Sequence, residues 1–192
     1  MDRTPSRFLG TRQSEKVDRA FRTAKAAHSG QRRKGGGSFF LHPLRVARQV
    51  AKVPHTTEMV CAALLHDVVE DTAVTIDQIR EEFGLTVARL VEALTCRLTP
   101  EDGNRATRKR MERESLASAG PEVGTVKLAD VMDNVRDIAV IDPGFAKVYL
   151  PEQLALAKAL ETADQDLRDQ AIELIEREMV KLDAVNELAS CS

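Results

Sequence analysis

The chain has 192 residues, with 43% hydrophobic residues, 30% charged residues and a formal net charge of −2. This length is typical of one domain, and the composition is that of an ordinary globular protein. The near-neutral charge argues against a nucleic-acid-binding protein, which needs a basic surface. No stretch approaches the roughly 20 apolar residues of a membrane-spanning helix, so we expect no membrane partner.

The start of the chain and the cysteines favour a cytoplasmic location. The first residues, MDRTPSRFLGTRQ, lack the apolar run of a signal peptide. The three cysteines are odd in number and form no CxxC pair, which favours reduced thiols over a disulfide framework.

Apolar residues recur at helical spacing along most of the chain, and no strand-like alternation is visible. In chain order we expect helices, some of them short, within residues 14–30, 42–53, 57–69, 71–84, 86–98, 108–118, 124–141, 151–163 and 166–188. This pattern predicts an all-α fold. We expect one domain over residues 1–192, with a core of about 14–164 and a C-terminal helix of about 166–188 packed on it or at an interface.

The segment CAALLHDVVEDT begins as an apolar helix and then carries His66, Asp67, Glu70 and Asp71 within six positions. A helix turns by about 100° per residue, so all four side chains fit on one broad face of a continuous helix. A buried charge is costly unless it is paired or bound to a metal. This crowding therefore favours a metal site beside the helix.

Two more residues are candidate ligands from elsewhere in the chain. His42 precedes Pro43, which suits the start of a helix, and Asp130 lies in an otherwise apolar helix with Asn134 one turn further on. Two histidines and two aspartates suit Mn²⁺, Fe²⁺ or Zn²⁺ and leave positions open for water. The plainer alternatives are a helix N-terminal histidine and an aspartate paired with a nearby cation.

Four blocks of the sequence resemble one known family. In chain order they are AHSGQRRKGGGSFFLHP, AALLHDVVEDT, FGLTVARLVEALT and VKLADVMDNVRD. The chain resembles the HD-domain metal-dependent phosphohydrolases and, within them, the small alarmone hydrolases related to the hydrolase half of Rel/SpoT enzymes. The resemblance implies an HD-domain helical bundle that removes the 3′-diphosphate of guanosine tetraphosphate or pentaphosphate, usually with Mn²⁺.

The same resemblance assigns roles to particular residues. It implies that the metal ligands are His42, His66, Asp67 and Asp130, and that Glu70 and Asp71 are the catalytic acid pair. It implies nucleotide contacts for Arg33, Lys34, Asn134 and, through a looser match, Tyr149. The chain departs from the family at Phe39-Phe40-Leu41, where the family usually has Tyr-Ile, and in the region 99–120. There Arg108, Lys109 and Arg110 are candidate contacts, although a solvated run of charges is the favoured interpretation.

Two other functions remain open from the sequence. One is an HD phosphohydrolase for another nucleotide, such as a phosphorylated dinucleotide or a deoxynucleotide. The other is a degenerate HD domain that senses a nucleotide without hydrolysing it, which loss of a metal ligand would indicate. All the expected ligands are present, so a hydrolase is favoured over a sensor.

Overall fold

The computed structural model describes residues 11–33 and 36–190, and within them it contains helices and no strand. The all-α prediction is confirmed. The chain divides into two compact units, residues 1–98 and residues 99–192, and each is described by itself. The expectation of a single domain stays a prediction.

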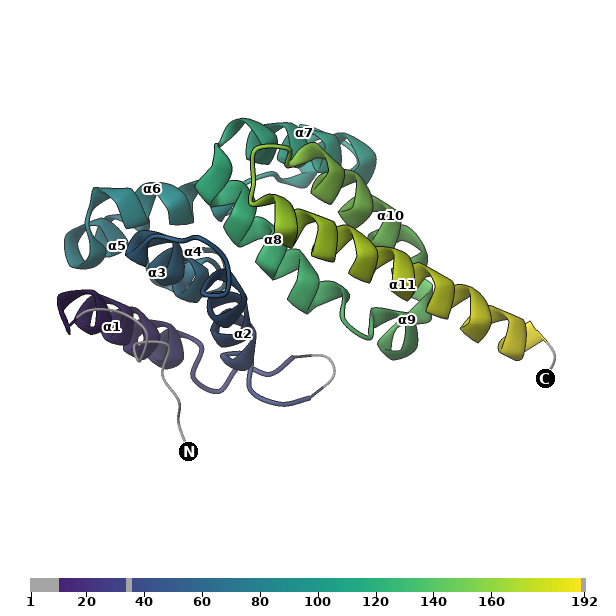
Figure 1. Ribbon diagram of the computed structural model, residues 1–192, viewed down its shortest axis with the longest axis horizontal. Coiled ribbons are helices and arrows are strands. Elements are labelled where there is room, and N and C mark those ends of the chain that lie inside the picture. Colours follow the sequence, from purple (N-terminus) through teal and green to yellow (C-terminus); the bar gives the residue numbers. More distant parts are fainter. Residues whose placement is uncertain (1–10, 34–35, 191–192) are drawn as a thin grey trace. The chain divides into compact units, whose positions relative to one another are not determined.

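The first unit is built around one apolar helix. Its helices are α1 (Thr11–Ala27), α2 (Leu41–Val50), α3 (Thr57–Leu65), α4 (Val68–Asp71), α5 (Ile76–Phe83) and α6 (Leu85–Leu94) (Figure 1). Helix α3 contacts α1, α2 and α6, and every residue except Glu58 is buried. A helix that is apolar on all sides belongs in the centre of a fold. The central position of α3 fixes its carboxyl end, where His66 follows.

The prediction of a continuous helix over residues 57–69 is wrong. Helix α3 ends at Leu65, and the short helix α4 begins at Val68. His66 and Asp67 lie in the turn between them, and the N–H of Asp71 donates to the carbonyl oxygen of Asp67 at 2.9 Å. On a continuous helix, adjacent side chains point about 100° apart. The interruption removes that restriction at the two residues expected to share one ion.

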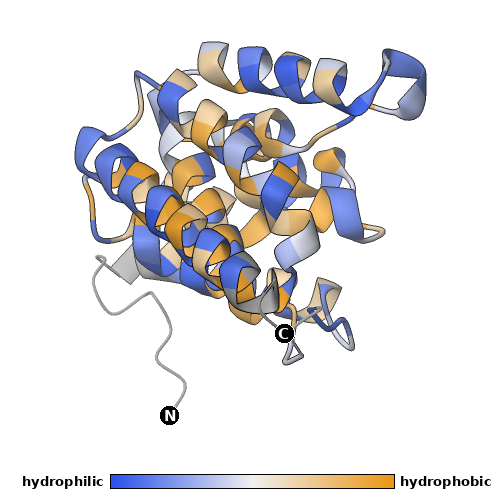
Figure 2. Ribbon diagram, turned by 90° about the vertical axis from the view of Figure 1, so that its right-hand side faces the viewer, coloured by the Kyte–Doolittle hydropathy of each residue, from blue (hydrophilic) through white to orange (hydrophobic). Residues whose placement is uncertain are grey.

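The described part of the second unit, residues 99–190, contains the 3₁₀ turn η2 (Pro100–Asp102) and the helices α7 (Arg105–Ser118), α8 (Pro121–Val135), α9 (Ile138–Ile141), α10 (Pro143–Ala159) and α11 (Gln165–Ser190). Helix α11 packs along α8, α9 and α10. Gly124 of α8 lies so close to Ala163 that a Cβ at position 124 would be 3.1 Å from the Ala163 Cβ. Leu116 is the buried residue of α7, whereas α8 is mostly buried, and Figure 2 shows the ribbon coloured by hydropathy.

The predicted start of a helix at Pro151 is also wrong. Helix α10 begins eight residues earlier, at Pro143, and Pro151 lies inside it. The Asp142 carboxylate accepts a hydrogen bond from the Phe145 N–H at 3.0 Å, and Pro143 occupies the first helical turn. A capping aspartate followed by proline is a strong start signal, whereas an interior proline costs one backbone hydrogen bond. The segment DPGF therefore begins a helix.

Candidate active site

Three side chains of the first unit converge in the way a metal site requires. His42 comes from the first turn of α2, and His66 and Asp67 come from the turn between α3 and α4. The two Nε2 atoms are 3.2 Å apart. One Asp67 oxygen lies 3.1 Å from the His66 Nε2, and the other lies 3.4 Å from the His42 Nε2. Both histidines are buried, and Asp67 is partly exposed.

The hydrogen bonding of His66 leaves the correct nitrogen for a metal. Its Nδ1 lies 2.9 Å from the carbonyl oxygen of Ala63, which can only accept, so Nδ1 carries the proton. In the neutral imidazole, Nε2 then presents a lone pair toward His42 and Asp67. A backbone carbonyl that orients the other ring nitrogen is the usual support of a ligating histidine.

The spacing of the three donors fits a divalent cation. With metal–ligand bonds of about 2.1 Å, neighbouring ligand atoms lie about 3.0 Å apart in an octahedron and about 3.4 Å apart in a tetrahedron. The observed separations of 3.1, 3.2 and 3.4 Å fall across this range. Lone pairs and a carboxylate that face one another this closely need a proton or a cation between them. His42, His66 and Asp67 therefore form a candidate metal site.

Asp130, the fourth expected ligand, lies in α8 of the second unit and is 4% exposed. One carboxylate oxygen accepts from Lys127 Nζ at 2.8 Å, and the other accepts from Asn134 Nδ2 at 2.6 Å. Burial opposes the charged form of Lys127, but the charge and hydrogen bond of Asp130 outweigh it and raise the Lys127 pKa. Asn134, one helical turn beyond Asp130, is thus hydrogen-bonded to it, and the ion pair with Lys127 that was the plainer alternative is also present.

The two expected catalytic acids lie on the short helix α4. A Glu70 carboxylate oxygen accepts the backbone N–H of Cys96 at 3.1 Å, which holds the side chain against the segment after α6. Local burial and the neighbouring Asp67 carboxylate raise the pKa of Asp71, against a lowering effect of the nearby histidines. A cation bound by Asp67 would oppose that increase in the Asp71 pKa. Both acids are exposed at the surface.

Two expected nucleotide contacts lie in the loop after α1. Arg33 is partly exposed, and its neighbour Lys34 lies outside the described residues. On either side of the undescribed residues, the Gly36 N–H donates to the Arg33 carbonyl at 2.9 Å, and residues 32 and 38 pair as an antiparallel bridge. These contacts hold the backbone on both sides of the undescribed residues within unit 1.

In the second unit, Tyr149 stacks on Phe145 with ring centroids 4.9 Å apart. The Arg105 guanidinium lies 5.7 Å from the Phe145 ring and makes two 2.8 Å hydrogen bonds to Glu152. The basic run of α7 is locally engaged in the same way: Arg108 with a backbone carbonyl, Lys109 with Glu112 and Arg110 with Glu114. These local partners favour the interpretation of α7 as a solvated charged helix.

A group of side chains that contacts His42 and Asp71 was not predicted from the sequence. His28, the residue after α1, is buried, and its ring packs on Phe39 at 4.7 Å between centroids. Phe39 in turn meets the His42 ring edge-on at 5.9 Å. Gln31 hydrogen-bonds both His28 and the Asp71 carbonyl. The segment AHSGQ places His28 and Gln31 three residues apart, but the hydrogen bond from Gln31 to Asp71 depends on tertiary contacts.

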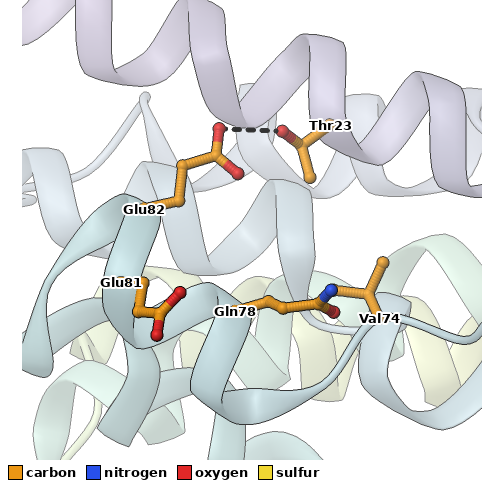
Figure 3. A pocket seen from close by; sticks show the side chains of 5 residues that line it. All are labelled: Thr23, Val74, Gln78, Glu81 and Glu82. Carbon is orange, nitrogen blue, oxygen red and sulfur yellow. Dashed lines mark hydrogen bonds between the residues drawn. The ribbon is translucent and has the colours of Figure 1, made fainter.

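A separate pocket of about 440 Å³ lies between α1 and α5 (Figure 3). It is lined by Thr23, Val74, Gln78, Glu81 and Glu82, and the Thr23 hydroxyl donates to Glu82 at 3.2 Å. Two glutamates on its wall repel a polyanion. The pocket is therefore unsuited to a nucleotide polyphosphate, and it shares no residue with the His42–His66–Asp67 group.

Comparison with known proteins shows the family. Residues 20–155 match the HD domain family, and the chain belongs to it. The chain is 36% identical over 158 residues to the mouse enzyme named guanosine-3′,5′-bis(diphosphate) 3′-pyrophosphohydrolase MESH1, and the alignment covers 78% of this chain and 87% of the mouse protein. Membership in this family implies a divalent metal, for which His42, His66 and Asp67 are candidate ligands.

A second curated relative and one solved structure support the same family assignment. A guanosine-3′,5′-bis(diphosphate) 3′-pyrophosphohydrolase of Aquifex aeolicus is 38% identical over 128 residues, which are 66% of this chain but only 18% of that protein. The chain thus spans about a fifth of several longer relatives. A solved structure of a metazoan ortholog of SpoT that hydrolyzes ppGpp superimposes with a TM-score of 0.75 at 26% identity, covering 85% of this chain and 95% of that one. The predicted HD-domain helical fold is confirmed.

One finding bears on the expected absence of a membrane partner. Among the described residues, none of the helices combines the length and apolar character needed to cross a bilayer.

Proposed function

We propose that this chain is a metal-dependent phosphohydrolase that removes the 3′-diphosphate of guanosine tetraphosphate or pentaphosphate. The products are GDP or GTP and pyrophosphate. The observation that carries the proposal is the convergence of His42, His66 and Asp67, with the acids Glu70 and Asp71 on the next helix. The substrate class comes from the names of the mouse and Aquifex aeolicus relatives.

Asp130 is proposed as the fourth ligand, and residues 1–192 as one functional domain. The family match over residues 20–155 runs through both compact units, which supports treating them as parts of one domain. Asp130 also has the support that ligating carboxylates usually have, because both of its oxygens are hydrogen-bonded. Mn²⁺ is the proposed ion, since a mixed set of imidazole and carboxylate donors suits it, although Fe²⁺ and Zn²⁺ also accept such ligands.

The bound ion would supply a polarised phosphoryl oxygen and a water of lowered pKa. The chain supplies positioning and proton transfer. Water adds to the phosphorus that is bonded to the 3′-oxygen. The bond between that phosphorus and the 3′-oxygen breaks, and the 3′-oxygen takes a proton. Glu70 and Asp71 are the proposed acids that hold the attacking water and deliver that proton. The pH–rate profiles of Glu70→Gln and Asp71→Asn distinguish the two roles.

Charge neutralisation is the other requirement of phosphoryl transfer. Arg33 and Lys34 are proposed to meet the nucleotide, since a guanidinium can pair with phosphate oxygens and stack on a purine. Asn134 and Tyr149 are proposed as further contacts. Of these, Asn134 has its amide nitrogen on Asp130, so it would link the nucleotide to the proposed ligand. The proposed partner is thus a small nucleotide rather than a nucleic acid, and the proposed location is the cytoplasm.

A panel of substrates tests the assignment. The Mn²⁺-loaded chain is incubated with guanosine tetraphosphate, guanosine pentaphosphate, GTP, dGTP and a phosphorylated dinucleotide, and products are separated by anion exchange. We expect pyrophosphate release from the two 3′-diphosphates only. Turnover of dGTP or the dinucleotide, with none of the 3′-diphosphates, would replace this substrate by the alternative one.

A further inference from the structure

The buried imidazole of His28 is joined to the end of α4 through one glutamine. The Gln31 side-chain nitrogen donates to the Asp71 carbonyl oxygen at 3.0 Å, and the Gln31 side-chain oxygen lies 2.8 Å from the His28 Nδ1. The first of these contacts joins residues that are 40 positions apart in the sequence. They connect the loop after α1 to the residue proposed as a catalytic acid.

The direction of each hydrogen bond follows from the Asp71 carbonyl. A carbonyl oxygen only accepts, so the Gln31 atom that faces it must be the amide nitrogen. The other amide atom is then the oxygen, which also only accepts, so the His28 Nδ1 must carry a proton. His28 is 1% exposed, and its Nε2 is buried with no hydrogen-bond partner among residues 11–33 and 36–190. The ring is therefore held by Gln31 and by packing.

Gln31 is itself fixed by its backbone. Its N–H donates to the His28 carbonyl at 3.2 Å, and its carbonyl accepts from the Phe39 N–H at 3.0 Å. The Phe39 ring lies against His28 on one side and meets His42 edge-on on the other. The backbone of Gln31 is thus held by two hydrogen bonds where its side-chain amide extends to Asp71.

Helix α4 needs such an outside support, because it contains only four residues, Val68–Asp71. A single helical turn is not stable by itself in water. We propose that Gln31, oriented by His28, is a positioning residue that fixes the carboxyl end of α4 and so directs Asp71 toward the metal site. This inference rests on the proposed function, in which Asp71 is a catalytic acid.

Gln31→Met tests the tie, because it removes both polar contacts at similar side-chain length. We expect kcat for guanosine tetraphosphate to fall about 10- to 100-fold, the scale of a misplaced catalytic group, with KM and bound metal unchanged. In the metal-free protein, amide hydrogen exchange of residues 68–74 should become faster while the rest of the chain is unchanged. Gln170→Met, at an exposed position of α11, is the matched control and should change neither quantity.

His28 provides a rescue test. His28→Asn keeps an N–H donor near the place of Nδ1 and should stay within about threefold of wild-type kcat, whereas His28→Leu should resemble Gln31→Met. Unchanged kcat in Gln31→Met, with an active wild type, would overturn the inference and leave the proposed function intact. A wild type that hydrolyses no 3′-diphosphate would overturn the proposed function. Unchanged exchange of residues 68–74 in Gln31→Met would overturn the tie in either case.

Discussion

The Nε2 atoms of His42 and His66 lie 3.2 Å apart, although the residues are 24 positions apart in the sequence. The proton on the His66 Nδ1 leaves its Nε2 as an acceptor that faces the other ring. A cation bound by both nitrogens would stabilise this close approach, and the Asp67 carboxylate supplies the negative charge that such an ion needs.

Replacing one of these histidines should therefore abolish metal binding while the protein remains folded. His66→Gln is expected to lower bound Mn²⁺ to a small fraction of one equivalent, and to reduce kcat at least 100-fold, because one ligand and its backbone support are lost. Metal content by mass spectrometry and far-ultraviolet circular dichroism measure the two effects. His55→Gln is the control, since His55 bonds only the nearby Val53 carbonyl among the contacts described. Full metal occupancy in His66→Gln would contradict the site.

The acids of α4 should separate chemistry from metal binding. Glu70→Gln and Asp71→Asn keep the size of each side chain and lose its charge, so metal content should stay near the wild-type level while kcat falls about 100- to 10,000-fold, the range for a lost general acid or base. A pH–rate profile of each variant, compared with wild type, shows which limb each acid controls. Glu82→Gln, at the separate acidic pocket, is the control. If both acid variants kept wild-type kcat, the catalytic pair would have to lie elsewhere.

Arg33 should contribute to binding more than to chemistry. Arg33→Met removes one cation from a site for a polyanion, so we expect KM to rise about tenfold, with kcat within a factor of about three, since each 1.4 kcal/mol of binding is a factor of ten. The exposed neighbour Arg32 offers the matched control Arg32→Met, which should change KM by less than twofold. Equal effects of the two substitutions would indicate general charge attraction instead of a contact.

The Lys127–Asp130 pair should link stability to the metal. Lys127→Met removes the cation from a buried carboxylate, and breaking a buried pair from one side costs about 3 kcal/mol or more. If Asp130 is a ligand, Mn²⁺ should raise the Tm of Lys127→Met more than that of wild type, because the ion replaces the lost charge. Thermal unfolding with and without Mn²⁺ measures this. Equal increases in Tm would argue that Asp130 does not bind the ion.

Much of the fold and candidate site could be predicted because the signals are local. The apolar run of α3 and the order of the four motif blocks were sufficient to nominate His42 and His66 together. The break after Leu65 was missed because helix propensity runs on through the apolar residues, whereas the observed turn lets the adjacent His66 and Asp67 share one site.

Other features depended on competition or on tertiary contacts. Two start signals compete for α10, the proline at position 151 and the capping side chain of Asp142. The structure shows that the capping signal of Asp142 determines the start. The link from His28 through Gln31 to Asp71 was not predictable, because it joins hydrogen-bonding groups that only the folded chain brings together.

The most direct test of the central claim is the Mn²⁺ dependence of guanosine tetraphosphate hydrolysis by the purified chain, stripped of metal and then titrated. GDP and pyrophosphate are quantified at each Mn²⁺ concentration, for the wild type and for His66→Gln. We expect both products in equal amounts, only with added metal, and neither product from His66→Gln at Mn²⁺ concentrations that saturate the wild type. Product formation without metal, or equal activity of His66→Gln, would contradict it.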